Sequence, residues 1–171
     1  MTSAFDRFER VARSVLRPAS KEPSRSGASE SADTAPEQEP HPFETRNIHP
    51  DLPPKVRSLF DDGHWEHATF EAFKFIEVEV KRISKIRGST GFALMMDAFK
   101  ETDAKVDLND LVTDSDINEQ KGYRHIFAGV SAGIRNPRGH EVDLGDTPIE
   151  CLDYLALASL LLRKLDTAGV R

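Results

Sequence analysis

Apolar residues recur at helical spacing through most of the chain beyond residue 47, and no stretch alternates apolar and polar positions as a half-buried strand would. The longest apolar stripe falls in residues 64–87 and consists of Trp65, Ala68, Ala72, Ile76, Val80, Ile83 and Ile86. Further apolar positions widen it, which is typical of a helix packed on more than one neighbour. On the outer side of this predicted helix, Glu77 and Lys81 stand four residues apart and are expected to pair.

Signals for helix starts and ends flank this long helix. Pro53-Pro54 opens a short helix before it, which ends at the turn formed by residues 61–63. Gly88 ends the long helix, and Ser89 is expected to cap the next one. The polar stretch that follows is expected to be an ordered excursion rather than a strand.

Two further helices complete the predicted fold. Asp116 is the expected cap of the first, which should stop near Arg135 because Asn136 precedes a proline and such residues avoid the α region. Thr147 and Glu150 form a capping box at the start of the last helix. We therefore predict an all-α fold, a bundle of four to five helices.

The chain divides into three segments by composition. Residues 1–17 have an apolar stripe decorated with arginines and predict an amphipathic helix, which either docks on a protein surface or frays when alone. A membrane-surface role is the less favoured third option, because Asp6 and Glu9 dilute its positive charge. Residues 18–47 are rich in Pro, Ser, Glu and Ala and predict a disordered linker, so the helical domain is assigned to residues 48–171.

Charge and composition restrict the classes of partner. The 171 residues carry a formal net charge of −6, so any contact with nucleic acid must come from a local basic patch. No apolar run approaches the length of a membrane span, and the first residues lack the apolar core of a signal peptide. The single cysteine, Cys151, permits no disulfide or cysteine-based zinc site within the chain. We therefore expect a cytoplasmic protein with no membrane partner.

The strongest candidate chemistry lies in residues 134–140, Ile-Arg-Asn-Pro-Arg-Gly-His. An ordinary helix-to-helix turn would explain these residues, since an arginine is favoured at a helix C-terminus and Pro-Arg-Gly is common in turns. The alternative is a functional pair. His140 can carry a proton near neutral pH, and Arg135 can fork onto two phosphate oxygens.

Arg135-Asn136-x-x-x-His140 resembles the pattern of the HEPN superfamily, whose small α-helical domains carry an arginine, a polar residue and a histidine at this spacing. Five segments follow one another in order along the chain. They are Gly63-His64-Trp65-x-x-Ala68, Glu71-Ala72-x-Lys74, Leu94-Met95-x-x-Ala98-Phe99, Ile134-Arg135-Asn136-Pro137-x-x-His140 and Leu157-Ala158-Ser159-Leu160-Leu161. These segments resemble the Ymh-like family within the superfamily, a family associated with abortive infection. The resemblance covers roughly residues 48–166.

This resemblance implies metal-independent RNA cleavage, in which the ribose 2′-OH attacks the neighbouring phosphate. Its catalytic residues would be His140 as general acid or base, Arg135 as phosphate clamp and Asn136 in support. Arg138 would add positive charge for RNA binding. No cofactor or metal is implied. The implied setting is a toxin or abortive-infection effector in phage or plasmid conflict, held by an antitoxin or regulatory protein.

A homodimer is expected from the same resemblance, because one chain supplies only one such histidine and two proton transfers are needed. A small-residue face, Ala128, Gly129, Ala132 and Gly133, would let a second copy approach closely. Packing within the chain explains these residues equally well. The alternative function is a non-catalytic dimeric module that binds a nucleotide, an RNA or a protein partner.

Other candidates are weaker. Lys121, Arg124 and His125 precede the stretch on the same predicted helix and either extend an RNA-binding track or form a solvated face. His64, His67 and Glu71 lie on one side of a helix and imitate a metal site, but three ligands from one helix rarely close a site. Glu71 and Lys74 are read as a surface pair, with orientation of the catalytic groups as the other possibility.

Overall fold

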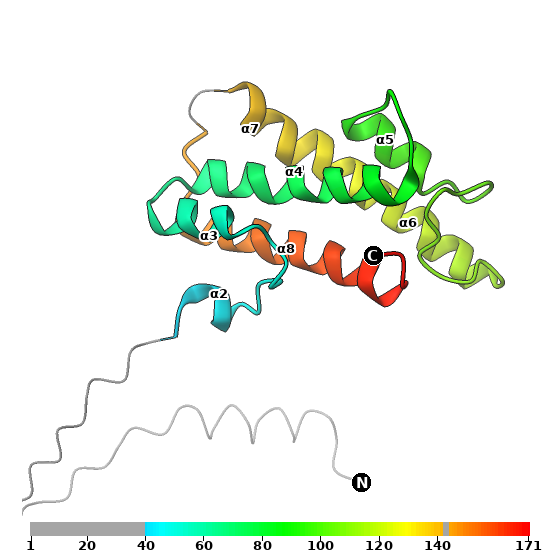
Figure 1. Cartoon of the computed structure of the whole chain (residues 1–171), viewed down its shortest axis with the longest axis horizontal. Helices are drawn as coiled ribbons and strands as arrows, with labels where there is room; N and C mark the ends of the chain where they lie inside the picture. Colours follow the sequence, from blue (N-terminus) through cyan, green and yellow to red (C-terminus); the bar gives the residue numbers. More distant parts are fainter. Residues whose placement is uncertain (1–39, 142–143) are drawn as a thin grey trace, which may run out of the picture. The chain divides into compact units, whose positions relative to one another are not determined.

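The structure is a computed structural model that describes residues 40–141 and 144–171 (Figure 1). These residues are helical with no strand among them, as the sequence predicts. The elements are α2 (Pro42–Thr45), α3 (Pro54–Asp61), α4 (Trp65–Ser84), α5 (Gly91–Ala98), α6 (Asp114–Val130), the π-helix η1 (Ser131–Arg135), α7 (Asn136–His140) and α8 (Pro148–Thr167). The helix predicted for residues 1–17 and most of the predicted linker lie outside the described residues. None of the described helices is long and apolar enough to cross a membrane.

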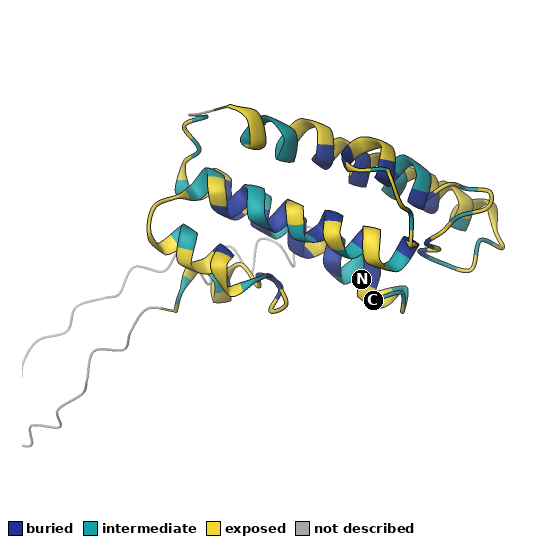
Figure 2. Ribbon diagram, turned by 45° about the horizontal axis from the view of Figure 1, so that its top comes forward, coloured by how far each residue is buried: buried dark blue, intermediate teal, exposed yellow. Residues whose placement is uncertain are grey.

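Helix α4 is the centre of the bundle. It contacts α3 and α8 along one side and α5, η1 and α7 along another, which explains the width of its apolar stripe (Figure 1). Its inward side is buried along the length of the helix, whereas its outward side alternates between exposed and partly buried residues (Figure 2). The largest fully buried side chains come mostly from α4, α5, α6 and α8, with Val56 from α3. Phe99, which follows α5, stacks on Phe127 at 4.5 Å between ring centroids.

The folded part begins before residue 48, the boundary expected from composition. Phe43 of α2 packs against the core, and Arg46 donates to Asp153 of α8 at 2.8 Å. The guanidinium of Arg163 also bonds to the backbone oxygen of Asn47. Residues 40–47 therefore belong to the helical domain and not to the linker.

Helix caps follow local sequence closely, with three corrections. Helix α4 ends at Ser84 with Lys85 as its C-cap, a few residues before the expected end at Gly88. The predicted capping box of Thr147 and Glu150 is present at the start of α8. Helix α6 begins earlier than expected, because Thr113 is its N-cap and Asp116 is the third helical residue of a second capping box. Thr90, not Ser89, precedes α5.

The expected end of the helix at Arg135 is wrong. Asn136 has helical φ and ψ angles of −62° and −46°, and the chain stays helical from Asp114 through His140. The backbone N–H of Asn136 donates to the carbonyl of Ser131, five residues back. This wider π turn lies directly before Pro137, which lacks an N–H and whose ring would crowd the preceding turn of a regular α-helix. The candidate stretch is thus a helix end, and the turn follows it.

The excursion between α5 and α6 is ordered by one buried side chain. The amide of Gln120 accepts from the N–H of Leu108 at 3.0 Å and donates to the carbonyl of Val106 at 2.9 Å. Val106 and Leu108 are themselves buried in the core. The expectation of an ordered, non-strand segment is confirmed.

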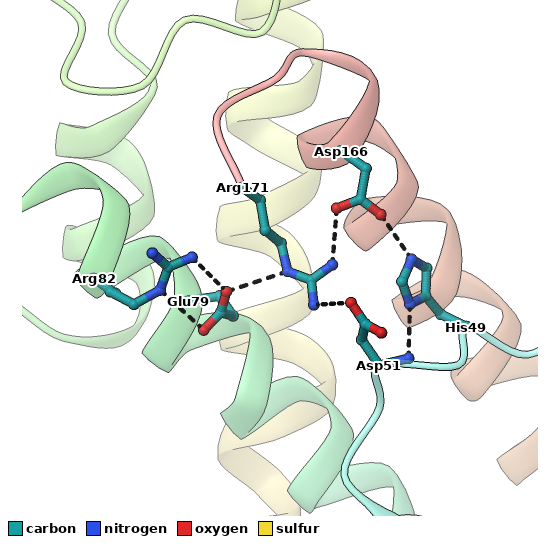
Figure 3. A network of polar contacts seen from close by, with 6 residues as sticks. All are labelled: His49, Asp51, Glu79, Arg82, Asp166 and Arg171. Carbon is teal, nitrogen blue, oxygen red and sulfur yellow. Dashed lines mark hydrogen bonds and ion pairs between the residues drawn. The ribbon is translucent and has the colours of Figure 1, made fainter.

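A polar network fastens the end of α8 to α4 and to the segment before α3. Figure 3 shows its members: His49, Asp51, Glu79, Arg82, Asp166 and Arg171. Arg171 donates to Asp166, Asp51 and Glu79 at 2.8, 2.8 and 3.2 Å. The Nδ1 of His49 accepts from a backbone N–H, so its Nε2 carries the proton and donates to Asp166 at 2.8 Å. Burial opposes ionisation of Asp166, but these two donors outweigh it and lower its pKa.

Candidate functional site

Arg135 ends the π segment η1 with its side chain turned toward α4. Its guanidinium carbon lies 5.2 Å from the centroid of the Phe70 ring. Its Nη1 donates to the side-chain oxygen of Asn136 at 3.1 Å. The ring and the amide hold the guanidinium in place while a quarter of the side chain stays exposed. Such an arginine is preorganised and still accessible to an anion.

A carboxylate faces Arg135 from inside the bundle. The Oε2 of Glu77 lies 3.7 Å from the Nε of Arg135, and the side chain of Glu77 is only 11% exposed. The expected pairing of Glu77 with Lys81 on the outer side of α4 is therefore wrong. Neither Oε2 of Glu77 nor Nε of Arg135 has a hydrogen-bond partner among the described residues. The two charges attract each other without being locked together.

The Phe70 ring also contacts a second cation, Lys74, and lies close to the backbone of Gly139. The Nζ of Lys74 lies 5.7 Å from the ring centroid, so Lys74 and Arg135 share one aromatic ring. On α7, a Cβ at Gly139 would come within 3.0 Å of the ring. The glycine thus allows α7 to approach α4 and bring Arg135 over Phe70.

Lys74 also belongs to a small ion-pair cluster. Its Nζ lies 3.4 Å from a carboxylate oxygen of Glu71, which Lys55 contacts at 3.1 Å. Burial would raise the pKa of Glu71, but the two lysines outweigh that effect and lower it. The surface-pair interpretation of Glu71 and Lys74 is confirmed, while Lys74 additionally borders the Arg135 site.

His140 is the last residue of α7 and is exposed. Asn136 lies four residues before it, on the same side of α7. With α-helical geometry, five residues separate Arg135 and His140 by about 140° around the axis and about 7.5 Å along it. Among the described residues, no hydrogen bond, ion pair or cation–π contact links His140 to Arg135. One chain therefore places the arginine against α4 and the histidine on another side of the helix.

The predicted RNA-binding residues have different environments. Arg138 forms a two-pronged pair with Asp146 at 2.6 and 2.7 Å, and their side chains are only 6% and 7% exposed. Arg138 also donates to the carbonyl of Ile134 and lies over the ring of Tyr154. It fastens α7 to the start of α8, and its charge is balanced by Asp146.

The three α6 residues predicted to extend the RNA-binding track also differ in how accessible they are. Arg124 donates to Glu101 at 2.7 Å and to the carbonyl of Met96 at 2.9 Å. Lys121 and His125 are exposed. Of the predicted phosphate track, Lys121 and His125 remain accessible, whereas the guanidinium of Arg124 is occupied within the chain.

The small-residue face divides into an inner and an outer part. Ala128 is fully buried in the core, as the intramolecular interpretation predicts. Gly129, Ala132 and Gly133 are exposed, and a Cβ added at either glycine would meet nothing within 4 Å. The outer part leads along the same continuous helix to Asn136 and His140. Another surface could pack closely against this part of the helix.

The possible metal cluster on α4 does not assemble. Within residues 40–141 and 144–171, no three His, Cys, Asp or Glu side chains converge in a way that could hold a metal ion. His64 and His67 lie ring to ring at 6.1 Å, but Glu71 is engaged by two lysines. These residues are better explained as the solvent side of a helix.

Local sequence indicated Arg135, Asn136 and His140, but it did not indicate Phe70 or the inward position of Glu77. In the sequence, Phe70 is one of the further apolar positions that widen the stripe of residues 64–87, and nothing else distinguishes it. The signal that could have identified Glu77 is its place in the helical repeat, one residue after the buried Ile76 and three before the buried Val80. An acid at such a position needs a partner from another element.

Comparison with known proteins finds a family match. Residues 46–165 match a family described as a protein of unknown function (Hypoth_ymh). No curated protein and no solved structure matches the chain. The matched segment contains α3 to α7 and nearly all of α8, including every residue of the site described above. Since the match extends over well more than half of the sequence, the chain belongs to the Hypoth_ymh family.

Proposed function

We propose that this protein is a metal-independent endoribonuclease of the HEPN type. The observation that carries the proposal is the gathering of two cations, Arg135 and Lys74, on the Phe70 ring beside the helix that ends in His140. Fixed positive charge beside a proton-carrying group is what phosphate-ester cleavage without a metal requires. RNA supplies the nucleophile itself, its 2′-OH.

The proposed step assigns one role to each residue. A base removes the 2′-OH proton, the 2′ oxygen bonds to phosphorus, and the 5′ oxygen leaves with a proton from an acid, giving a cyclic phosphate and a free 5′-OH. His140 serves as the base or the acid. Arg135 binds the phosphate oxygens as their charge grows, and Asn136 orients Arg135 through its hydrogen bond.

We infer further that two copies build the active cleft. One chain separates His140 from Arg135, and the reaction needs one group to accept a proton and another to donate one. Packing of a second copy against Gly129, Ala132 and Gly133 would bring its His140 toward the first copy. The biological setting that we propose, from the family resemblance, is a toxin or abortive-infection effector in the cytoplasm under control of an antitoxin or regulatory protein.

The separation of Arg135 and His140 also favours a second candidate, a non-catalytic dimeric module. In that case the same cationic site would bind a nucleotide, an RNA or an acidic protein segment without cleaving it. Arg135 would remain essential for binding, and His140 would be dispensable.

Cleavage of structured RNA in EDTA tests the proposal directly. Wild-type protein should cleave, and Arg135→Ala and His140→Ala should each abolish cleavage while keeping the fold and the oligomeric state. His125→Ala is the matched control, because His125 is an exposed histidine on the same continuous helix. Cleavage that survives both substitutions would contradict the proposal. Intact RNA binding without any cleavage would favour the binding module.

Mixing the two inactive variants tests the shared cleft. If Arg135 of one copy works with a single histidine, His140 of the other copy, a mixed dimer of Arg135→Ala and His140→Ala holds one complete arginine–histidine pair and regains activity. If the reaction needs His140 of both copies, or if both residues act within one chain, the mixed dimer is inactive.

A further inference from the structure

The solvent side of α4 carries a line of lysines. Lys74, Lys81 and Lys85 are all exposed. Lys74 and Lys81 are seven residues apart and lie on one side of α4, whereas Lys85 is the C-cap directly after the helix, with a left-handed φ of 57°. They lie about 10 Å and about 6 Å apart along the axis. Arg87, also exposed, follows beyond the end of the helix.

The acidic residues of α4 are engaged elsewhere. Glu66 accepts backbone N–H groups of residues 144–146, and Glu71 is paired with Lys55 and Lys74. Glu77 faces Arg135, and Glu79 is paired with Arg82 and Arg171.

The outer lysines keep their charge uncompensated. Among the described residues, no carboxylate lies within ion-pair distance of Lys81 or Lys85. This side of α4 is therefore a local positive stripe on a chain with a net charge of −6.

One end of the stripe meets the candidate site. Lys74 and Arg135 contact the same Phe70 ring, so the lysine line continues into the arginine without a gap. The distance of about 16 Å from Lys74 to Lys85 equals about five phosphate intervals of a stacked strand at about 3.4 Å each. A strand laid along α4 would therefore place one phosphate at Arg135 and others at the lysines.

We propose that single-stranded RNA binds along α4, with its phosphates on Lys74, Lys81 and Lys85 and the reacting phosphate at Arg135. This inference rests on the proposed ribonuclease function and adds the path of the substrate. A narrow line of cations fits the backbone of one strand. The stripe has one exposed apolar residue, Val78, at 55%, and thus lacks the broad apolar face that insertion into a lipid surface requires. The alternative is that RNA binds along α6 through Lys121, and the test below distinguishes the two paths.

Salt-dependent binding of a non-cleavable probe tests the path. The full-length protein is titrated with a fluorescent single-stranded 2′-O-methyl oligonucleotide in EDTA over a range of salt concentrations. Each phosphate contact contributes about 0.7 to the slope of log affinity against log salt for a single strand. The double variant Lys81→Ala/Lys85→Ala should lower that slope by about 1.4. Lys105→Ala, which removes an exposed lysine paired with Asp103, should leave the slope unchanged.

The outcomes are distinct. The inference is overturned if the slope of log affinity against log salt is the same in the double variant as in the Lys105→Ala control. It is also overturned if only Lys121→Ala lowers this slope, or if the wild-type protein does not bind the probe. Because the probe cannot be cleaved, a lowered slope supports the path even if the protein proves inactive on natural RNA. In that case the ribonuclease proposal fails and the binding surface stands.

Discussion

Arg135 and Glu77 face each other across the packing of η1 on α4, with Nε and Oε2 3.7 Å apart and no hydrogen bond between them. The arginine therefore has a counter-charge behind it, while its Nη1 is held by Asn136 in front. A buried carboxylate that is close but not bonded stabilises the charge of the guanidinium. Because Nε is buried, the remaining N–H groups of Nη1 and Nη2 are the ones that a ligand could bind. This relationship makes Glu77 a positioning residue for the proposed phosphate clamp.

Replacement of Glu77 with glutamine should separate binding from cleavage. Glu77→Gln keeps the size of the side chain but removes the negative charge behind Arg135, so affinity for a non-cleavable RNA should rise several-fold. The guanidinium loses its orientation, so kcat should fall at least ten-fold. Stability should fall by about 1–2 kcal/mol, because the charge of Arg135 is then partly buried without its counter-charge.

Binding titrations and single-turnover cleavage measure the two effects. Glu119→Gln is the control, because it removes an acid that is paired with Lys164 on the surface. If Glu119→Gln raises affinity equally, the effect reflects net charge and not the position of Glu77.

The contact between Gly139 and Phe70 gives a second prediction. Alanine at a helical glycine normally stabilises a protein by up to about 1 kcal/mol. At Gly139 the added Cβ would lie 3.0 Å from the ring of Phe70 and push the ring or α7 away. We expect Gly139→Ala to lose about 1–2 kcal/mol of unfolding free energy and most cleavage activity.

Gly122→Ala is the matched substitution, since Gly122 is also helical and a Cβ there meets nothing within 4 Å. Urea unfolding should show that this variant is slightly more stable than the wild type. Equal stabilisation by both substitutions would mean that Gly139 is not needed for the approach of α7 to α4.

We expect Arg138 to contribute to the stability of the fold and not to RNA binding, the role that the sequence predicts for it. Burial opposes the charge of Arg138, but the hydrogen bonds and negative charge of Asp146 outweigh this and raise its pKa. Arg138→Met leaves Asp146 buried without a partner and should cost about 3 kcal/mol. Adding Asp146→Leu should recover much of that loss. Denaturant unfolding measures both, and the salt slope of RNA binding should be unchanged in the double variant.

The parts of this molecule that sequence predicted well are those decided by neighbours in the chain. The capping box of Thr147 and Glu150 depends on residues three apart, and the helical repeat of α4 depends on residues three or four apart. Such features are visible in a short window.

The errors have two origins. The local effect of Pro137 predicts a helix end at Arg135, but the π turn directly before the proline keeps Asn136 helical. Distant contacts decide the other cases. The partners of Glu77 and of Arg138 come from other elements or from the following loop, and no local pattern signals them. The candidate residues Arg135 and His140 were therefore found by sequence, whereas the surroundings that orient Arg135 were not.

Cys151 provides a pH-dependent test of the core. Burial raises the pKa of its thiol to about 11, above the ordinary value of about 8.5 for an exposed cysteine. As pH rises between these values, the unfolded chain releases the thiol proton and the folded chain keeps it, so this group increasingly favours unfolding. Cys151→Ala removes the effect entirely, because the chain has one cysteine. The stability of the wild type should therefore fall relative to Cys151→Ala between pH 8 and pH 10 in urea titrations.

Reactivity of the Cys151 thiol tests the same burial. In the folded wild type at pH 8, the thiol should resist a disulfide reagent until denaturant is added. Rapid reaction of the thiol, or stability curves of the two proteins that stay parallel as pH rises, would show that Cys151 is accessible and that α8 packs less tightly on α4 than described.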